Sequence, residues 1–218
     1  MVYADNAATT KMSRTAIDAM LPYMETHYGN PSSLYRLGQE AAEALQSARE
    51  TVAACLGCTP REITFTSGGS EADNQALISA ARIGERKGKM HIISTAFEHH
   101  AILHTLKKLE KEGFEVELLP VGPIGTVTAQ QVADAIRPDT CLVTTMYANN
   151  EIGSILPIAE IGAVCREKVS CSIPTPCRPP VISASRSTSR TSICCPSPAT
   201  SSTAPRVPAF SLPGRASL

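Results

Sequence analysis

The residues of this sequence that are best suited to chemistry lie in short polar segments that directly follow apolar runs. After Ile63-Thr64-Phe65 comes a Gly-rich turn that contains Gly69 and Ser70. Glycines let the backbone turn tightly, and the first amides of the following helix then favour an anion, as the helix dipole does. The pattern therefore predicts a phosphate cradle, although a plain helix start capped by Ser70 fits the same residues.

Two further segments carry groups for proton transfer and hydrogen bonding. His99 and His100 follow the apolar run 91–94, and adjacent imidazoles either transfer protons near neutral pH or cap a helix. Asn149 and Asn150 follow a later apolar run, and amide side chains either hold a ligand oxygen or make turns. A metal site would need more ligands at suitable spacing, and we predict none.

Two loops of small and polar residues complete the set of candidate site segments. The first contains Asn6 and Ala7, and the second is Asn30-Pro31-Ser32-Ser33. Each of the five segments is a weak signal alone. Their joint meaning depends on whether one scaffold places them on the same side.

Helices and strands alternate along residues 1–168. Hydrophobic spacing, capping residues and β-branched runs predict helices over 13–26, 33–56, 70–86, 101–112, 128–137 and 158–168, and strands over 63–65, 91–94, 114–119 and 141–145. This order predicts an α/β fold with a mostly parallel sheet and helices on both faces. Ligands of such sheets bind at the carboxyl ends of the strands, where the polar segments lie.

The composition divides the chain into two parts. The whole chain has 20 basic and 20 acidic residues, but residues 169–218 contain five Arg and no Asp, Glu or Lys. The same 50 residues hold nine of the 16 Pro and 12 Ser. A segment of this kind buries too little apolar surface to offset its ordering entropy. We expect residues 1–168 to fold and residues 169–218 to be a disordered tail.

Several classes of function are disfavoured. The zero net charge and the absence of Trp give no electrostatic or stacking basis for binding nucleic acid or an anionic membrane. The N-terminus has neither a basic region nor an apolar core of a signal peptide, and no run approaches the length of a membrane span. Cys55 and Cys58 form a C-x-x-C motif without a second pair, which indicates incidental thiols more than a redox or zinc site. The expected location is the cytoplasm.

The order and spacing of the polar segments resemble those of a known family. DNAATT, GNPSS, FTSGGSEADN, EHHAIL and NNEIG are similar to the N-terminal part of cysteine desulfurases of the NifS/IscS type. That family belongs to the class V aminotransferases, which have the fold type I architecture of enzymes dependent on pyridoxal 5′-phosphate (PLP). The resemblance covers residues 1–168 and implies an incomplete large domain of that fold.

The resemblance implies a role for each candidate residue. Gly69 and Ser70 would bind the PLP phosphate, His99 would stack on the pyridine ring and move protons, and Asn150 would bind the phenolic oxygen. Residues Asn6, Ala7, Asn30 and Ser32 would line the substrate side. The parent enzyme would be a homodimer that converts L-cysteine to L-alanine and passes the sulfur to an acceptor or Fe–S scaffold protein.

The family's chemistry also needs an Asp at the ring nitrogen, a Lys that binds PLP covalently and a mobile nucleophilic Cys. Residues 169–218 contain no Asp or Lys. If one base was lost after the codon for Lys168, residues 169–183 read back as GVLFHTDAVQAAGHL and residues 194–209 as MLSLSGHKFHGPKGAG. These peptides carry the family's H-x-D-A-x-Q and S-x-H-K motifs. We therefore interpret the tail as translated out of frame, which would leave the chain inactive.

Other interpretations remain open. Another class V aminotransferase or a selenocysteine lyase would share the logic of residues 1–168. The chain could also be a non-catalytic fragment or a dimerisation module that pairs with an intact subunit.

Overall fold

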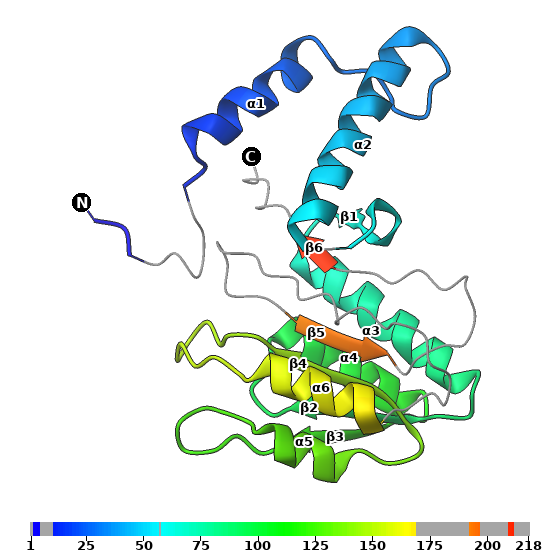
Figure 1. Ribbon diagram of the computed structural model, residues 1–218, viewed down its shortest axis with the longest axis vertical. Coiled ribbons are helices and arrows are strands. Elements are labelled where there is room, and N and C mark those ends of the chain that lie inside the picture. The colour runs from blue at the N-terminus through cyan, green and yellow to red at the C-terminus, as the bar shows by residue number, and fades with distance from the viewer. Residues whose placement is uncertain (1, 5–10, 57, 169–191, 197–208, 212–218) are drawn as a thin grey trace.

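A four-stranded sheet forms the centre of the chain in the computed structural model (Figure 1). The structure describes residues 2–4, 11–56, 58–168, 192–196 and 209–211. The strands of this sheet, in spatial order, are β3 (Glu115–Leu119), β2 (His91–Thr95), β4 (Thr140–Met146) and β5 (Ser192–Pro196). β2 pairs in parallel with both β3 and β4, which confirms the predicted parallel α/β core.

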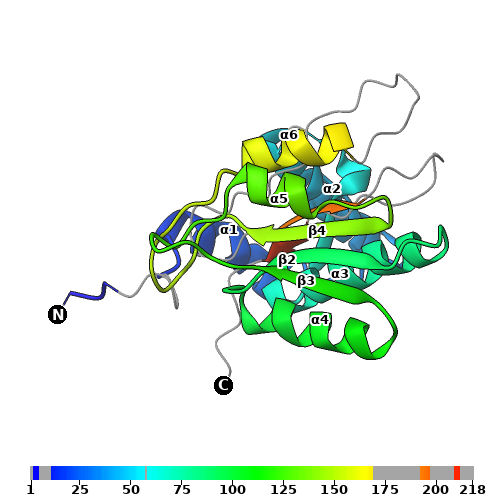
Figure 2. The same ribbon diagram turned by 90° about the horizontal axis from the view of Figure 1, so that it is seen from below.

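Helices cover both faces of this sheet. They are α3 (Gly69–Glu85) and α4 (His100–Lys111) on one face and α5 (Ala129–Ala135) and α6 (Ile158–Lys168) on the other. Helices α1 (Arg14–Glu25) and α2 (Arg36–Leu56) and the 3₁₀ turn η1 (Pro60–Glu62) lie outside these two layers. Figure 2 shows α3 and α4 below the sheet and α5 and α6 above it. Among the described helices, none is long and apolar enough to cross a membrane.

The predicted boundaries agree with these elements to within a few residues, and the local causes are visible. At the start of α5, the Thr128 hydroxyl accepts a bond from the Gln131 amide (3.2 Å) and the Gln131 side chain accepts one from the Thr128 amide (2.8 Å). This is the predicted capping box. The similar pair Thr59 and Glu62 opens only η1, because β1 (Thr64–Thr66) begins directly afterwards.

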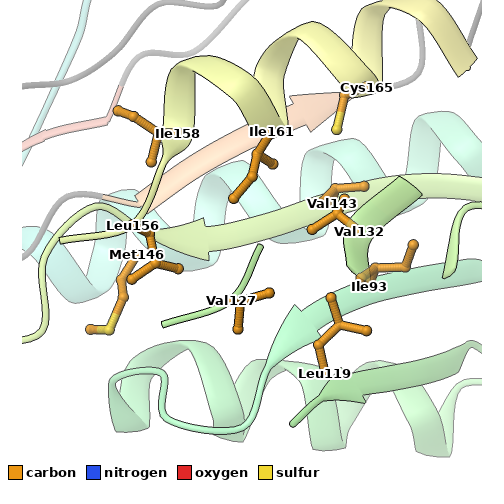
Figure 3. Close-up of a cluster of buried hydrophobic side chains, with 10 residues drawn as sticks. All are labelled: Ile93, Leu119, Val127, Val132, Val143, Met146, Leu156, Ile158, Ile161 and Cys165. Carbon is orange, nitrogen blue, oxygen red and sulfur yellow. The ribbon is translucent and has the colours of Figure 1, made fainter. Parts of the chain in front are cut away.

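The central strands β2 and β4 are buried along their whole length because helices cover both faces of the sheet, whereas the edge strand β3 exposes Glu115 and Glu117. Successive side chains of a strand point to opposite faces, so Ile92 and Leu142 pack against α3 and α4, whereas Ile93 and Val143 face α5 and α6. Figure 3 shows the second cluster, which consists of Ile93, Leu119, Val127, Val132, Val143, Met146, Leu156, Ile158, Ile161 and Cys165. Continuous apolar strands of this kind are typical of parallel sheets.

Two short strands lie within the segment that was expected to be disordered. β5 pairs antiparallel with β4, and β6 (Ala209–Ser211) pairs in parallel with β1. The backbone of an edge strand presents unpaired N–H and C=O groups, which an extended segment of almost any sequence satisfies. Strand β5 comprises five residues of this segment and β6 comprises three, and the expectation of disorder for the segment stays a prediction. The rest of residues 169–218 lies outside the described residues.

Helix α1 lies apart from the sheet (Figure 1) and has no buried residue. Its large apolar side chains are exposed; they are Met20, Leu21, Tyr23 and Met24. Helix formation here is supported locally, since the Ser13 hydroxyl caps the first turn by accepting from the Ala16 amide (3.2 Å). The apolar stripe of α1 is thus formed but uncovered in the single chain.

The close contact between α3 and β4 yields a test of the packing. A methyl group added at Gly84 would lie 2.9 Å from Cys141 Sγ and 3.1 Å from the Lys89 carbonyl oxygen. We expect Gly84→Ala to lower the free energy of unfolding by about 1–3 kcal/mol despite the better helix propensity of alanine. Urea denaturation measures this, with Ser79→Ala on the exposed side of α3 as control. A G84A variant as stable as the wild type would contradict the described packing.

Candidate active site

Two of the polar segments predicted from the sequence follow neighbouring strands of the parallel sheet. β2 ends at Thr95 and β4 ends at Met146, and the two strands run in the same direction side by side. The loop after β2 leads to α4, and the loop after β4 carries Asn149 and Asn150. Because carboxyl ends of parallel strands share an edge, these loops are neighbours.

The Gly-rich turn forms the N-terminus of α3. The first helical bond runs from the Ala72 amide to the Gly68 carbonyl oxygen (3.1 Å), so the amides of Gly69 and Ser70 precede the hydrogen-bonded ladder. Gly69 is half-buried and Ser70 is exposed. Two amides, one hydroxyl and the positive end of the helix dipole are suited to an anion such as a phosphate.

An acidic side chain closes the turn before α3. Glu71 Oε2 accepts hydrogen bonds from the Ser67 amide (2.7 Å) and the Ser67 hydroxyl (2.5 Å). These bonds hold the pKa of Glu71 below its usual range, because they favour the ionised carboxylate. The Glu71 carboxylate thus fixes the turn geometry through Ser67, ahead of the cradle amides.

His99 caps the next helix. Its Nδ1 accepts a hydrogen bond from the Ala101 amide (3.1 Å), and its carbonyl oxygen receives the first backbone bonds of α4 from Ile102 and Leu103. The capping alternative considered for this histidine is therefore present. Since Nδ1 accepts, a neutral His99 ring carries its proton on Nε2. This capping bond holds the His99 ring at the end of the β2–α4 loop, where α4 begins.

The two asparagines after β4 have different surroundings. Asn149 is only 9% exposed; its Oδ1 accepts from the amides of Glu151 (2.8 Å) and Ile152 (3.0 Å), which is turn chemistry. Its Nδ2 donates to the Phe97 carbonyl oxygen (3.3 Å) in the β2–α4 loop. Asn150 is half-buried, and its side-chain amide makes no hydrogen bond to the described residues. Asn150 therefore retains the capacity to bind a ligand oxygen.

A buried carboxyl lies between the two loops. Glu98 is 6% exposed, and its Oε1 accepts hydrogen bonds from the Thr95 hydroxyl (2.8 Å) and the Met146 amide (2.7 Å). Its other oxygen, Oε2, is buried and has no hydrogen-bond partner within the described part of the chain. Glu98 thus bonds the end of β2 and its loop to the end of β4.

Burial decides the ionisation of this carboxyl. Desolvation raises the pKa of Glu98 to about 7, while the bonds from Thr95 and Met146 oppose the rise and the carboxyl of Asp73 adds to it. Asp73 lies in α3 and is 8% exposed. The carboxyl of Glu98 is therefore largely protonated in mildly acidic solution. Near neutral pH it is protonated in only part of the molecules.

The remaining predicted site residues are placed differently. Asn30 and Ser32 form the turn between α1 and α2, where Asn30 Oδ1 accepts from the Ser32 amide (2.9 Å). This turn lies far from the sheet in Figure 1, so the single chain does not bring it to the strand ends. Asn6 and Ala7 lie outside the described residues. The substrate-side role of these four residues remains a prediction.

Sequence reasoning missed Glu98 as a contributor to the site. The available signal was an acidic residue at the end of an apolar strand, directly before the two histidines, since charged residues are seldom buried without a partner. Its donors were not foreseeable, because Met146 is 48 residues away in the sequence. Thr95 would read as an ordinary β-branched strand residue.

The cysteine motif lies at and after the end of α2. Cys55 is exposed at the end of α2 and Cys58 is half-buried after it, and neither follows a strand at the start of a helix. Among the described residues, no three His, Cys, Asp or Glu side chains are grouped to hold a metal ion.

The raised pKa of Glu98 predicts a pH-dependent stability. The folded chain binds this proton more tightly than the unfolded chain, so stability falls as the pH rises from about 4.5 to about 7, in total by about 3 kcal/mol. Glu98→Gln mimics the protonated acid. We expect it to match the wild type near pH 5 and to exceed it by about that amount at pH 8.

Urea denaturation at both pH values measures the difference, and Glu110→Gln, at an exposed position of α4, is the matched control. If the wild type and Glu98→Gln lose stability equally between pH 5 and pH 8, the described environment of Glu98 is wrong.

Comparison with known proteins shows the family to which the chain belongs. The sequence model of the aminotransferase class-V family matches residues 2–173. Cysteine desulfurase IscS of Methanosarcina thermophila is 49% identical over 166 residues, which are 76% of this chain and 41% of the relative. The chain therefore spans less than half the length of this relative.

Solved structures give the same result. A NifS-like protein superposes with a TM-score of 0.73 and 39% identity, covering 77% of this chain and 46% of that one. A structure of SspA in complex with cysteine gives a TM-score of 0.71 and 38% identity, covering 76% and 47%. The fold is that of the large domain of these proteins, in part. The chain belongs to the aminotransferase class-V family, and within it is similar to the cysteine desulfurases.

Proposed function

We propose that this chain is the N-terminal part of a PLP-dependent cysteine desulfurase and that, as written, it is catalytically inactive. The parent enzyme converts L-cysteine to L-alanine and leaves the sulfur as a persulfide on an enzyme cysteine. The observation that carries the proposal is that the loops with His99 and Asn150 follow neighbouring parallel strands, β2 and β4, while Asp73 near the start of α3 acts on Glu98 between these loops. The identity of 49% to a named desulfurase supports the same reading.

The residues at the strand ends fit PLP. The amides of Gly69 and Ser70 at the positive end of α3 suit its phosphate, and the half-buried amide of Asn150, which bonds to no described residue, suits its phenolic oxygen. The His99 ring is fixed by its capping bond, as a stacking group must be. When bound, PLP supplies an electron sink for negative charge that develops on the substrate.

The residues of this chain would bind PLP and orient it. The Ser70 hydroxyl and the cradle amides hold the phosphate at a fixed end of the sheet. Because Nδ1 of His99 is committed to the Ala101 amide, Nε2 is the atom that holds or moves a proton. The side-chain amide of Asn150 would donate a hydrogen bond to the phenolic oxygen of PLP and so help to orient the cofactor.

Three groups that the chemistry needs are absent from the proposed site. Residues 169–218 provide neither an Asp for the ring nitrogen nor a Lys for covalent attachment, and their cysteines lack the family's loop pattern. We attribute this to a lost base after the codon for Lys168. Sequencing the DNA across that codon tests the attribution, because a frame whose codons forbid the alternative translation would exclude it.

Two relatives in chemistry stay as alternatives for the parent enzyme. Another class V aminotransferase or a selenocysteine lyase would use the same cradle, histidine and asparagine. Assays of the frame-restored protein with cysteine, selenocysteine and keto acids separate these activities. A desulfurase removes sulfur from its substrate, a selenocysteine lyase removes selenium, and an aminotransferase transfers the amino group to a keto acid.

The partners of the parent enzyme follow from the same proposal. It would act in the cytoplasm as a homodimer and transfer sulfur to an acceptor or Fe–S scaffold protein. The uncovered apolar side chains of α1 support a second subunit on that side, since a stripe of this kind marks an interaction surface or an aggregation hazard. The same surface supports the second candidate, a non-catalytic module that pairs with an intact subunit.

The inactivity of the chain is directly testable. We expect the purified 218-residue protein, supplied with PLP and L-cysteine, to release no more alanine and sulfide than the enzyme-free mixture. The frame-restored protein should produce both. Its variant with the restored lysine replaced by alanine is the control for reactions of free PLP. Turnover by the 218-residue chain would refute the proposal.

The subunit contact gives a second test. In the frame-restored protein we expect Met24→Glu to shift the mass measured by light scattering from dimer to monomer, because a buried unpaired charge opposes association. Thr15→Glu adds the same charge at an exposed polar position of α1 and should leave the dimer intact. A dimer that tolerates both substitutions would place the interface elsewhere.

A further inference from the structure

Two loops that carry proposed PLP-binding residues are joined by one buried side chain. Glu98 Oε1 accepts from the Thr95 hydroxyl at the end of β2 and from the Met146 amide at the end of β4. Both bonds lie in the interior, and Glu98 is only 6% exposed. The carboxyl therefore fixes the separation of the two strand ends beyond what the strand pairing itself requires.

A second bond joins the same loops. Asn149 Nδ2, after β4, donates to the Phe97 carbonyl oxygen in the β2–α4 loop (3.3 Å). Glu98 directly precedes His99, and Asn149 directly precedes Asn150. His99 and Asn150 are thus each the chain neighbour of a residue that bonds one loop to the other.

Packing alone does not account for a carboxyl at this position. An apolar side chain of similar volume would avoid the desolvation penalty that Glu98 incurs, and Glu98 Oε2 is left without a hydrogen bond to the described residues. The carboxyl of Asp73 in α3 acts on Glu98 as a like charge. A costly group that accepts from both strand ends indicates that their relative position matters.

We propose that Glu98 is a positioning residue of the PLP site: its carboxyl clamps the loop that carries His99 to the strand end that leads to Asn150. The proposal rests on the proposed function for the identity of the ligand. The groups that face Glu98 are the Thr95 hydroxyl, the Met146 amide and the carboxyl of Asp73. No contact between Glu98 and PLP is required.

Two substitutions separate positioning from bulk packing. Glu98→Gln keeps an oxygen that accepts both bonds, whereas Glu98→Ala removes the acceptor. In nuclear magnetic resonance spectra of the isotope-labelled full chain, we expect E98A to move the resonances of the His99 ring and the Asn150 amide. In E98Q these resonances should stay close to their wild-type positions, and the exposed control Glu110→Gln should leave them unchanged. Unmoved His99 and Asn150 resonances in E98A would overturn the proposal.

The Met146 amide offers a direct probe of the clamp. Its resonance should titrate with the Glu98 carboxyl, with a midpoint near the pKa of about 7, and the titration should vanish in E98Q. If E98A fails to fold, Thr95→Val decides the matter. Loss of the Thr95 hydroxyl removes a bond that lowers the pKa of Glu98, so the Met146 midpoint should move to higher pH and the His99 ring resonances should shift. An unchanged midpoint counts against the clamp.

Binding of PLP, followed by its absorbance and fluorescence, distinguishes the clamp from the proposed function. If the wild-type chain binds PLP, E98A should weaken binding about tenfold or more, as expected when binding groups are misplaced, and E98Q should stay within about twofold. Equal PLP affinities in the wild type and E98A would overturn the positioning role. If the 218-residue chain does not bind PLP, the same comparison is made in the frame-restored protein, which has the Lys and the Asp. Failure of the frame-restored wild type to bind PLP would overturn the proposed function alone, and the resonance shifts still decide whether the clamp exists.

Discussion

The parallel pairing of β2 with β4, buried on both faces, is the constraint on which the rest of the structure depends. Ile92 and Leu142 point to one layer of helices, and Ile93 and Val143 point to the other. Because both faces are covered, a polar side chain within the two strands costs free energy unless it is hydrogen-bonded. Polar chemistry is therefore confined to the ends of the strands, and parallel pairing places the carboxyl ends of β2 and β4 next to each other.

The same burial explains how the candidate site is built. Where the strands end, backbone groups lose their ladder partners and must be satisfied by side chains. Glu98 accepts from the Met146 amide, and Asn149 accepts from the two amides that follow it in the turn. These side chains satisfy the loops internally, and they directly precede His99 and Asn150 in the chain. The hydrogen bonds that order the loops at the strand ends thus also order the chain beside the residues proposed to bind a ligand.

The chain carries only part of the structure that its relatives have. It spans 41% of a similar desulfurase, and the similarity ends near residue 173. In this chain the edge of β4 that faces away from β2 pairs with β5. The apolar side chains of α1 are exposed. A strand edge and an apolar stripe are both surfaces that a longer chain or a second subunit would bury. Such surfaces make a fragment prone to association.

Local patterns determined much of this protein. The alternation of helices and strands, the capping box at Thr128 and the polar residues after each strand were readable because hydrophobic period and capping act within a few residues. The resemblance to desulfurases was carried by those same segments. The change of composition after residue 168 was also visible in the sequence.

The tertiary structure alone decided which of these segments meet. It places His99 and Asn150 on one edge but leaves Asn30 and Ser32 at the distant α1–α2 turn. It also assigns Glu98 its environment, since the Met146 amide that it binds is 48 residues away. A carboxyl's burial and its pKa depend on what packs around it in space, so no local pattern could have shown that this glutamate joins the two loops.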